Sequence, residues 1–173
     1  MEFVIRDAKE EDLHSIMQIM NRTEQGGTPS EWYVTDSEEV VRKEIQGEDI
    51  VLVAETDHTV AGFFIAKYPD MESNLGTFLG YTQEQLDKVV IMDSAAVAPQ
   101  FQGNGLQGKM LEEIEKRIDW TKYQYSMCTV HPENCYSLHN MQKHGYEVKK
   151  TVRCYGNHIR HILVAERSKK TNE

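Results

Sequence analysis

The sequence predicts an α/β (mixed α+β) fold in which helices flank one mixed sheet. Three observations support this prediction. Short β-branched runs and segments with helical periodicity are interleaved along the 173 residues. Pairs of β-branched runs joined by short polar turns, at 50–67 and 146–165, predict a hairpin in each half of the chain. An apolar run at 89–97 leads through a glycine-rich loop into an amphipathic segment, which predicts a strand followed by a helix.

The first half of the chain is predicted to contain strands and helices in the order βααββ. The elements are a strand at 3–6, a helix after the capping-box pair Asp7 and Glu10, a helix capped by Asp36 or Ser37 and extending to about 45, and hairpin strands at 50–55 and 59–67. A polar loop between the two helices carries Trp32 and Tyr33, which are expected to pack within the loop.

The second half is predicted to continue as βαβαββ after an insertion at 68–88. Thr82 and Gln85 have capping-box spacing, so a short helix is expected inside the insertion. The later elements are a strand at 89–97, a helix at 103–118, a strand at 125–130, a helix at 134–144 and strands at 146–153 and 158–165. Because no repeat or linker divides them, one domain is expected at 1–167, followed by a polar tail at 168–173.

The composition argues against several function classes. A formal net charge of −9 disfavours nonspecific nucleic-acid binding, which needs clustered positive charge, and is compatible with a cationic substrate such as an amine. No apolar run approaches the ~20 residues of a membrane span, and the acidic start MEFVIRDAKEED lacks the features of a secretion signal. We therefore expect a cytoplasmic protein that binds neither nucleic acid nor membranes.

The cysteines and the acidic residues also limit the chemistry. Cys128, Cys135 and Cys154 form an odd set without CxxC spacing, which favours reduced thiols over a disulfide framework or a zinc site. Cys128 is expected to be a buried apolar residue rather than a nucleophile. No acidic residue lies between Ser94 and Leu111, so an anion could approach this stretch without repulsion.

The glycine-rich loop matches two phosphate-binding patterns by itself. Gly103–Gly108 satisfies GxGxxG, but Pro99–Phe101 separates it from its strand, and the next strand lacks the acid expected about twenty residues later. The same glycines with Lys109 satisfy GxxxxGK, but Met110 stands where a P-loop needs Ser or Thr for magnesium. Neither a dinucleotide site nor a P-loop is therefore favoured.

The residues around the loop complete a third pattern. Val97 and Pro99 precede Gln102-Gly-Asn-Gly105, and an amphipathic helix follows. A second block matches N-x-x-A/S-x-x-x-Y-x-K-x-G-F/Y at Asn134, Ser137, Lys143, Gly145 and Tyr146. With their flanking strands and helices, the two blocks resemble the GNAT superfamily of acetyl-CoA-dependent N-acetyltransferases. The resemblance covers nearly the whole chain except the insertion and the tail.

The resemblance implies a GNAT-like central sheet of about seven strands, mixed and mostly antiparallel, splayed at strands 4 and 5. Acetyl-CoA would be the acetyl donor, its pantetheine lying between those strands, and no metal is implied. By position, the cofactor-binding residues would be Ala95, Ala96, Val97, Gln102, Gly103, Asn104, Gly105, Leu106, Gln107, Gly108, Asn134 and Ser137. Gln107 stands where Gly or Ala is usual and adds bulk beside the pyrophosphate.

The implied reaction is direct transfer of an acetyl group to a primary amine of a small molecule or peptide. Met141 occupies the place of a tyrosine that protonates the departing thiolate in many relatives, and Tyr155 or water could replace it. Asp93, an acid in an otherwise apolar strand, is a candidate base or else a paired structural carboxylate. His131 has a suitable intrinsic pKa but could instead orient the turn before Pro132.

The missing tyrosine also motivates an alternative function. A non-catalytic acyl-CoA-binding or regulatory module of the same fold would need no proton donor at Met141. The sequence does not identify the acceptor amine. Many relatives are dimers, so a homodimer is one state that the resemblance allows.

Overall fold

The computed structural model describes residues 1–25 and 31–167. Seven strands form one sheet in the order β1-β2-β3-β4-β5-β7-β6, which confirms the predicted mixed sheet. The chain packs as two compact units. The first unit is Met1–Lys67 with Asp93–Arg117, and the second is Tyr68–Met92 with the chain from Ile118 onward. The single domain at 1–167 stays a prediction.

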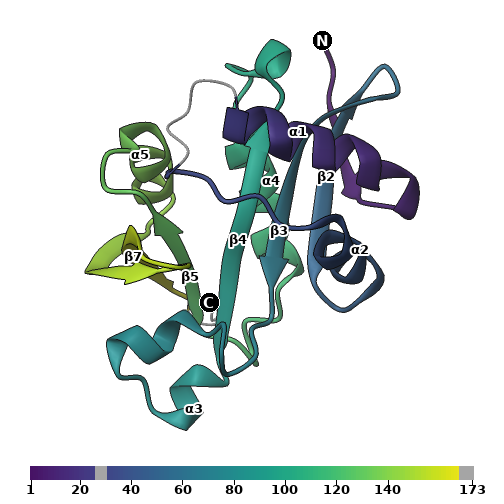
Figure 1. Cartoon of the computed structure of the whole chain (residues 1–173). Coiled ribbons are helices and arrows are strands. Elements are labelled where there is room, and N and C mark those ends of the chain that lie inside the picture. The colour runs from purple at the N-terminus through teal and green to yellow at the C-terminus, as the bar shows by residue number, and fades with distance from the viewer. Residues whose placement is uncertain (26–30, 168–173) are drawn as a thin grey trace. The chain divides into compact units, whose positions relative to one another are not determined.

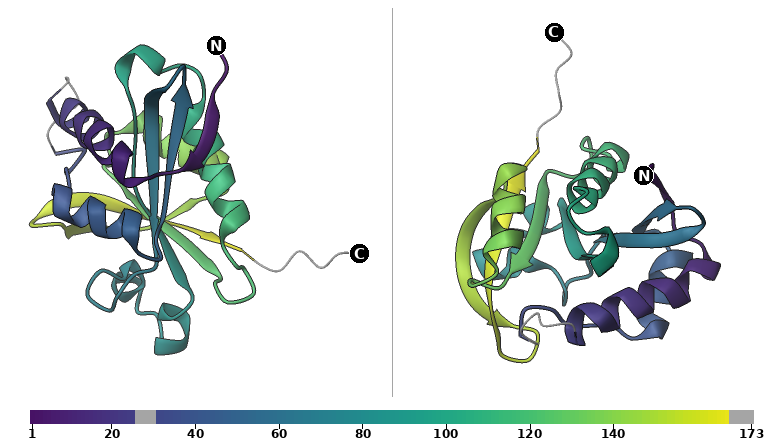
Figure 2. Two further views of the ribbon diagram at one scale, coloured as in Figure 1. Left: turned by 90° about the vertical axis from the view of Figure 1, so that its right-hand side faces the viewer. Right: turned by 90° about the horizontal axis from the view of Figure 1, so that it is seen from above.

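The first unit consists of a strand group covered by helices on both faces. Its elements are β1 (Val4–Asp7), the 3-10 turn η1 (Glu10–Asp12), α1 (Leu13–Gln25), α2 (Glu38–Gln46), β2 (Ile50–Thr56), β3 (Thr59–Lys67), the second half of β4 (Val89–Val97), the 3-10 turn η3 (Pro99–Phe101) and α4 (Leu106–Arg117). α1 and α2 cover one face of β2 and β3, and α4 covers the other (Figures 1 and 2).

The core of this unit explains its strand register. β1 and β3 both pair with β2 in antiparallel fashion, with Arg6 opposite Val53 and Val53 opposite Phe63. This register directs Val53 and Phe63 into one core with Ile16 of α1, and all three side chains are fully buried. Each such burial stabilises the fold by roughly 1.5–3 kcal/mol.

The first helical segment begins later than the sequence predicted. The helix cap consists of the backbone N–H of Lys9 and the side chain of Asp12, and the predicted pair Asp7 and Glu10 does not form it. Asp12 Oδ2 accepts the Lys9 N–H at 2.7 Å, and both Asp12 oxygens accept hydrogen bonds from the Arg6 guanidinium at 2.7 and 2.9 Å. Because Arg6 lies on β1, this tertiary ion pair fixes the helix start, and local spacing alone could not show it.

The second unit contains the rest of the sheet. Its elements are η2 (Leu75–Leu79), α3 (Gln83–Leu86), the first half of β4, β5 (Tyr125–Val130), α5 (Cys135–Lys143), β6 (Glu147–Cys154) and β7 (His158–Glu166). β4 pairs with β5 in parallel over Val89–Ile91, whereas β7 pairs with β5 and β6 in antiparallel fashion. None of the described helices has the length and apolar character that crossing a membrane requires.

The insertion at 68–88 contains one element that the sequence did not predict. The expected capping box of Thr82 and Gln85 is present at the start of α3. The additional 3-10 helix η2 begins after Asn74, whose side chain accepts the Gly76 N–H at 3.0 Å and donates to Leu86 O at 2.9 Å. This one buried amide therefore joins η2 to α3 and makes the insertion a compact layer.

Candidate active site

The second half of β4 carries an acid within a network of charges. Asp93 has a side-chain exposure of 21%, and its Oδ2 lies 3.2 Å from the Nζ of Lys67, the last residue of β3. The same Nζ lies 2.6 Å from Oε1 of Glu44, which α2 buries at 4% exposure. Lys67 therefore bridges a strand carboxylate and a helix carboxylate within the first unit.

Burial changes the acid–base properties of this network. It raises the pKa of Glu44 to about 7, although the ammonium of Lys67 opposes the rise. It also raises the pKa of Asp93 above its ordinary value. Burial disfavours a charged Lys67, but the charges of Asp93 and Glu44 raise its pKa above the ordinary value. Lys67 thus stays protonated, and Glu44 titrates near neutral pH.

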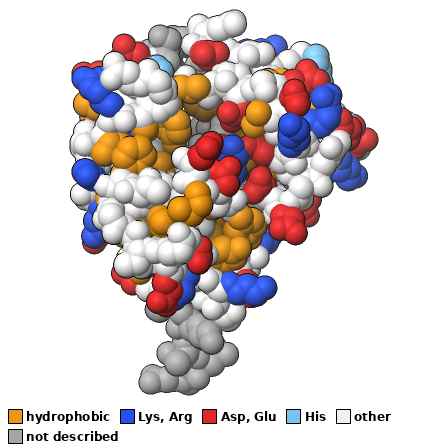
Figure 3. Space-filling view, turned by 60° about the horizontal axis from the view of Figure 1, so that its bottom comes forward, with side chains coloured by type: hydrophobic (Ala, Val, Ile, Leu, Met, Phe, Trp, Pro, Cys, Tyr) orange, Lys and Arg blue, Asp and Glu red, His pale blue; other side chains and the backbone are white. Residues whose placement is uncertain are grey.

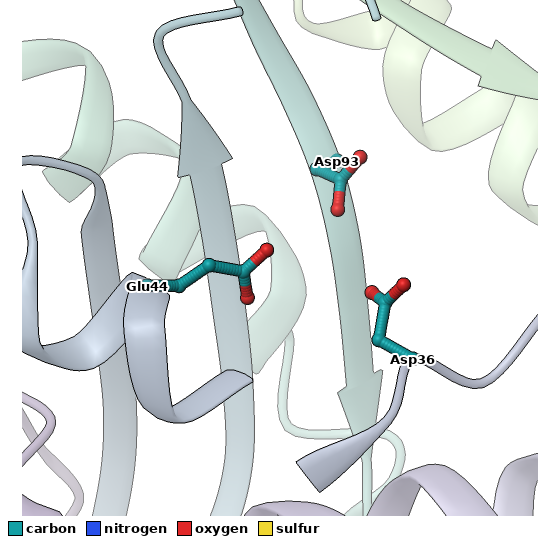
Figure 4. Close-up of side chains that lie close together, drawn as sticks. All are labelled: Asp36, Glu44 and Asp93. Atoms are coloured by element: carbon teal, nitrogen blue, oxygen red, sulfur yellow. The ribbon is translucent and has the colours of Figure 1, made fainter. Parts of the chain in front are cut away.

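A third carboxylate, that of Asp36, lies close to those of Glu44 and Asp93. Asp36 lies in the loop before α2, and one oxygen each of Asp36, Glu44 and Asp93 lie within 4.8 Å of one another. Figure 4 shows the three side chains pointing toward one another from the loop, α2 and β4. Among the residues that the structure describes, none donates a hydrogen bond to Asp36. On the face seen in Figure 3, acidic side chains gather around a basic one.

Tyr33 links this loop to β4 beside Asp93. Its hydroxyl forms a 2.7 Å hydrogen bond with the hydroxyl of Ser94, the residue after Asp93. Burial raises the pKa of Tyr33 above its ordinary value, so the phenol stays neutral and able to donate. The sequence predicted a packing role for Tyr33, and the structure adds a polar contact to the strand.

Glu44 provides a direct test of these charge effects. Glu44→Gln keeps the shape of the side chain and removes its titration. Because the pKa rises from its ordinary 4.5 to about 7 on folding, the native state holds the proton more tightly between these values. The resulting stabilisation is fully present below pH 4.5 and is lost as pH rises through 7.

The free energy of unfolding of the wild type, minus that of Glu44→Gln, should therefore fall by roughly 2–3 kcal/mol between pH 5 and pH 8. Urea denaturation at several pH values measures it. Glu39→Gln, on the exposed face of the same helix, is the matched control. If the wild type minus Glu44→Gln difference in unfolding free energy stayed constant or grew over this pH range, the raised pKa of Glu44 would be contradicted.

The glycine loop before α4 leaves backbone donors available. Gly103 and Gly105 have φ of 84° and 69°, which only glycine adopts readily, and a Cβ at either position would meet no atom within 4 Å. Leu106, Gln107 and Gly108 form the first turn of α4, where N–H groups have no acceptor one turn earlier. No acidic residue lies in that turn.

The loop is held in shape by its own side chains. Gln102 donates to Val97 O at 3.3 Å, and Asn104 donates to Phe101 O at 2.8 Å. Glycines with open surroundings, followed by first-turn N–H groups at the positive end of a twelve-residue helix, fit a bound diphosphate. The residues present therefore fit the pyrophosphate of acetyl-CoA.

The predicted pantetheine strand precedes this loop and is joined to it by the 3-10 turn η3 (Pro99–Phe101). Ala95 and Val97 are partly exposed, and Ala96 is buried. β3 approaches β4 closely here, since a Cβ on Gly62 would lie 2.9 Å from Ala96 O, and Ala98 N donates to Ala61 O at 2.8 Å. The backbone of β4 is thus fixed from the β3 side.

The second unit carries the predicted residues of the other block. Asn134 caps α5, its Oδ1 accepting the Ser137 N–H at 3.2 Å. Its Nδ2 donates to no residue that the structure describes, so it is available to a ligand. Met141, in the place of the usual tyrosine, is buried at 5% exposure. Cys128 is buried as expected, and burial raises the pKa of its thiol.

The other two candidate catalytic residues also lie in the second unit. His131 is buried and its Nδ1 accepts the Glu133 N–H at 3.1 Å, so a neutral ring carries its proton on Nε2. This contact is the turn-orienting role that the sequence allowed. Tyr155 is 48% exposed in the β6–β7 turn, and its hydroxyl accepts a hydrogen bond from Thr129 at 3.3 Å.

Sequence reasoning missed three residues of the charge network: Asp36 as a site residue, Glu44 and Lys67. Glu44 did leave a signal, because it follows Val41 by three residues and shares its buried helical face. Lys67 is a cation at the end of a buried strand. Neither pattern indicates which residue the side chain pairs with, because the partners lie on different helices and strands.

The sequence model of the acetyltransferase (GNAT) family matches residues 13–146. The chain belongs to the GNAT acetyltransferase family. No curated protein sequence matches it. Several solved GNAT-like structures share its fold over nearly its full length, at low sequence identity.

Three of these structures illustrate the likeness. A ribosomal-protein-alanine N-acetyltransferase from Brucella melitensis has a TM-score of 0.73 at 19% identity, with 95% of this chain and 99% of that chain covered. An N-acetyltransferase from Staphylococcus aureus Mu50 has a TM-score of 0.74 at 16% identity, with 97% and 99% covered. A GNAT phosphinothricin acetyltransferase from Sinorhizobium meliloti, in complex with acetyl-CoA, has a TM-score of 0.74 at 17% identity, with 100% and 92% covered.

Membership in the GNAT family confirms the family predicted from the two sequence blocks, together with its mixed sheet. It also confirms the predicted class of enzyme, an acetyl-CoA-dependent N-acetyltransferase. The GNAT neighbours in the comparison, at 12–20% identity, show the fold and identify no acceptor for this chain.

Proposed function

We propose that the protein transfers an acetyl group from acetyl-CoA directly to the primary amine of a small molecule or peptide. The observation that carries the proposal is the position of Asp93. It is a largely buried carboxylate of raised pKa, on the strand that continues into the glycine loop and in the same compact unit. A proton acceptor and a diphosphate cradle thus belong to one continuous βα segment.

The cofactor would be held mainly by backbone groups. The N–H groups of Gly103–Gly108 would bind the diphosphate, and the backbone of Ala95–Val97 would bind the pantetheine. The N–H of Gln102 donates to Pro99 O at 3.3 Å, so Gln102 would contribute through its side chain. Asn134 is the proposed cofactor-binding residue of the second unit, through its Nδ2. Ser137 supports Asn134 through the cap of α5. Acetyl-CoA supplies the acetyl group activated as a thioester. We propose no metal in this site.

Asp93 would take the proton of the acceptor. An aliphatic ammonium cannot attack an acyl group, so it must first lose a proton to a base. Burial gives Asp93 a higher proton affinity than an ordinary aspartate. The ion pair with Lys67 holds its carboxylate in place. For the departing thiolate, Tyr155 or water is the proposed proton donor, because Met141 has no ionisable group. His131 is the second candidate base.

We also propose a cytoplasmic location and a homodimer.

A thiol-release assay tests the reaction. Purified protein with acetyl-CoA and a panel of primary amines should release free CoA in an amine-dependent manner, and mass spectrometry should find the acetylated amine. Calorimetry with acetyl-CoA is the accompanying binding measurement. If neither CoA nor acetyl-CoA bound at millimolar concentration, we would abandon the proposal.

The second candidate is a non-catalytic acyl-CoA-binding or regulatory module. The observation that favours it is the buried Met141 in the place of the usual proton donor. This candidate predicts binding of acetyl-CoA without amine-dependent thiol release, so the same two measurements separate it from the enzyme.

A further inference from the structure

The charge network of the first unit is unbalanced. The carboxylates of Asp36, Glu44 and Asp93, hereafter the acidic group, lie around the ammonium of Lys67, the one cation that forms an ion pair with them among the described residues. The charge of Asp49 also reaches Asp93 and adds to the negative potential. At a pH where the carboxylates are ionised, the group keeps a net negative charge beside the strand that carries the proposed base.

The buried carboxylate of Glu44 lacks an aligned hydrogen-bond donor. Its side chain is 96% buried, yet no residue that the structure describes donates an aligned hydrogen bond to either of its oxygens, even with Lys67 Nζ 2.6 Å away. Burying a carboxylate costs several kcal/mol, and the ion pair with Lys67 offsets only part of this cost, because neither oxygen has an aligned donor. The Glu44 carboxylate points toward those of Asp36 and Asp93, so a ligand that donates a hydrogen bond there would lower the remaining cost (Figure 4).

We propose that the acidic group binds a second positive charge on the acceptor, so that the preferred substrates are small aliphatic diamines. The inference rests on the proposed acetyl transfer and specifies its substrate class. Asp36 and Glu44 would accept hydrogen bonds from the non-reacting ammonium, and Asp93 would face the reacting nitrogen on the side of Ser94 and Ala95.

The local charge decides which nitrogen binds where. Surplus negative charge raises the pKa of a bound amine and keeps it protonated and unreactive. An ammonium held between Asp36 and Glu44 therefore cannot be the nucleophile. The reacting nitrogen would lie on the other side of Asp93, toward Ser94 and Ala95, and Asp93 is the member of the acidic group proposed to take its proton.

Lys67 makes an organic cation a better ligand than a metal ion. Mg²⁺ and Ca²⁺ need carboxylate oxygens at about 2.0–2.6 Å, on positions free of other cations. The Lys67 ammonium already lies beside the oxygens of Glu44 and Asp93 and would repel a divalent ion. A monovalent ammonium can instead donate to Asp36 at an ordinary hydrogen-bond distance.

The experiment compares three amines of equal length: n-butylamine, 1,4-diaminobutane and 4-aminobutyrate. Calorimetry with the wild-type protein should show that the diamine binds at least about tenfold more tightly than butylamine, as expected for one charge-assisted contact. In the thiol-release assay the kcat/KM should follow the same order, with 4-aminobutyrate the poorest acceptor. Asp36→Asn should lower the ratio of diamine to butylamine about tenfold. Glu39→Gln, an exposed acid on α2, should leave it unchanged.

The outcomes separate the two proposals. Equal affinity of wild-type protein for diamine and butylamine overturns the second-charge inference, whether or not acetyl transfer occurs. An unchanged ratio in Asp36→Asn and in Glu44→Gln, each checked for folding by thermal denaturation, overturns it as well. Charge-dependent binding without thiol release from any amine instead supports the inference and contradicts the proposed enzyme function.

Discussion

Replacing Asp93 with asparagine should lower the turnover of acetyl transfer by about 100- to 10,000-fold, the usual range for loss of a general base. Asparagine keeps the shape of the side chain but cannot take a proton from the acceptor ammonium. The substitution removes the ion pair between Asp93 and Lys67, but Lys67 keeps its ion pair with Glu44. Acetyl-CoA affinity should change little, because the proposed diphosphate donors are backbone groups of Gly103–Gly108.

Steady-state kinetics across pH 6–9 and calorimetry with acetyl-CoA measure the two effects. The limb of the pH–rate profile that belongs to the base should disappear in Asp93→Asn. Asp57→Asn is the matched control, because Asp57 is exposed in the β2–β3 turn and its positive φ suits asparagine. Wild-type rates at every pH would remove Asp93 from the mechanism.

Gly105→Leu should weaken acetyl-CoA binding by at least about 10- to 100-fold, or roughly 1.4–2.8 kcal/mol. Gly105 has φ of 69°, and a side chain there would enter the open space in front of the first turn of α4. That space is where the diphosphate would approach the backbone N–H groups, so the side chain and the ligand would compete for it.

Gly80→Leu is the control for backbone strain. Gly80 has φ of 70° and equally open surroundings, but it caps η2 in the second unit. Both variants should lose about 1–2 kcal/mol of stability from the left-handed backbone. Calorimetry should show weakened acetyl-CoA binding in Gly105→Leu alone. Equal affinities in the two variants would rule out a phosphate role for the loop.

Local sequence patterns predicted most of the fold. The β3 strand at Thr59–Lys67, the β4 strand at Val89–Val97 and the capping box of Thr82 and Gln85 are all present as expected. These elements depend on neighbours in the chain, which the sequence displays directly. The start of the first helix was predicted wrongly, because Arg6 recruits Asp12 by a tertiary ion pair.

The candidate site was predicted only where it is continuous in sequence. Asp93 stood out as one acid in an apolar strand, and the glycine loop follows that strand after a short Pro99–Phe101 turn. Lys67, Glu44 and Asp36 lie 26, 49 and 57 positions from Asp93. Their meeting depends on which strands are neighbours and on the face of α2 that packs inward, and neither can be derived from periodicity alone.

The buried carboxyl of Glu44 couples ligand binding to proton release. With a pKa of about 7, it carries a proton in a large share of molecules at neutral pH, beside Asp36, Asp93, Lys67 and the charge of Asp49. A cation that binds there favours the ionised form and expels that proton. The heat of binding should then depend on the ionisation enthalpy of the buffer, and affinity for a diamine should increase from pH 6 to pH 8. The enzyme would thus bind its acceptor more tightly as its surroundings become more alkaline.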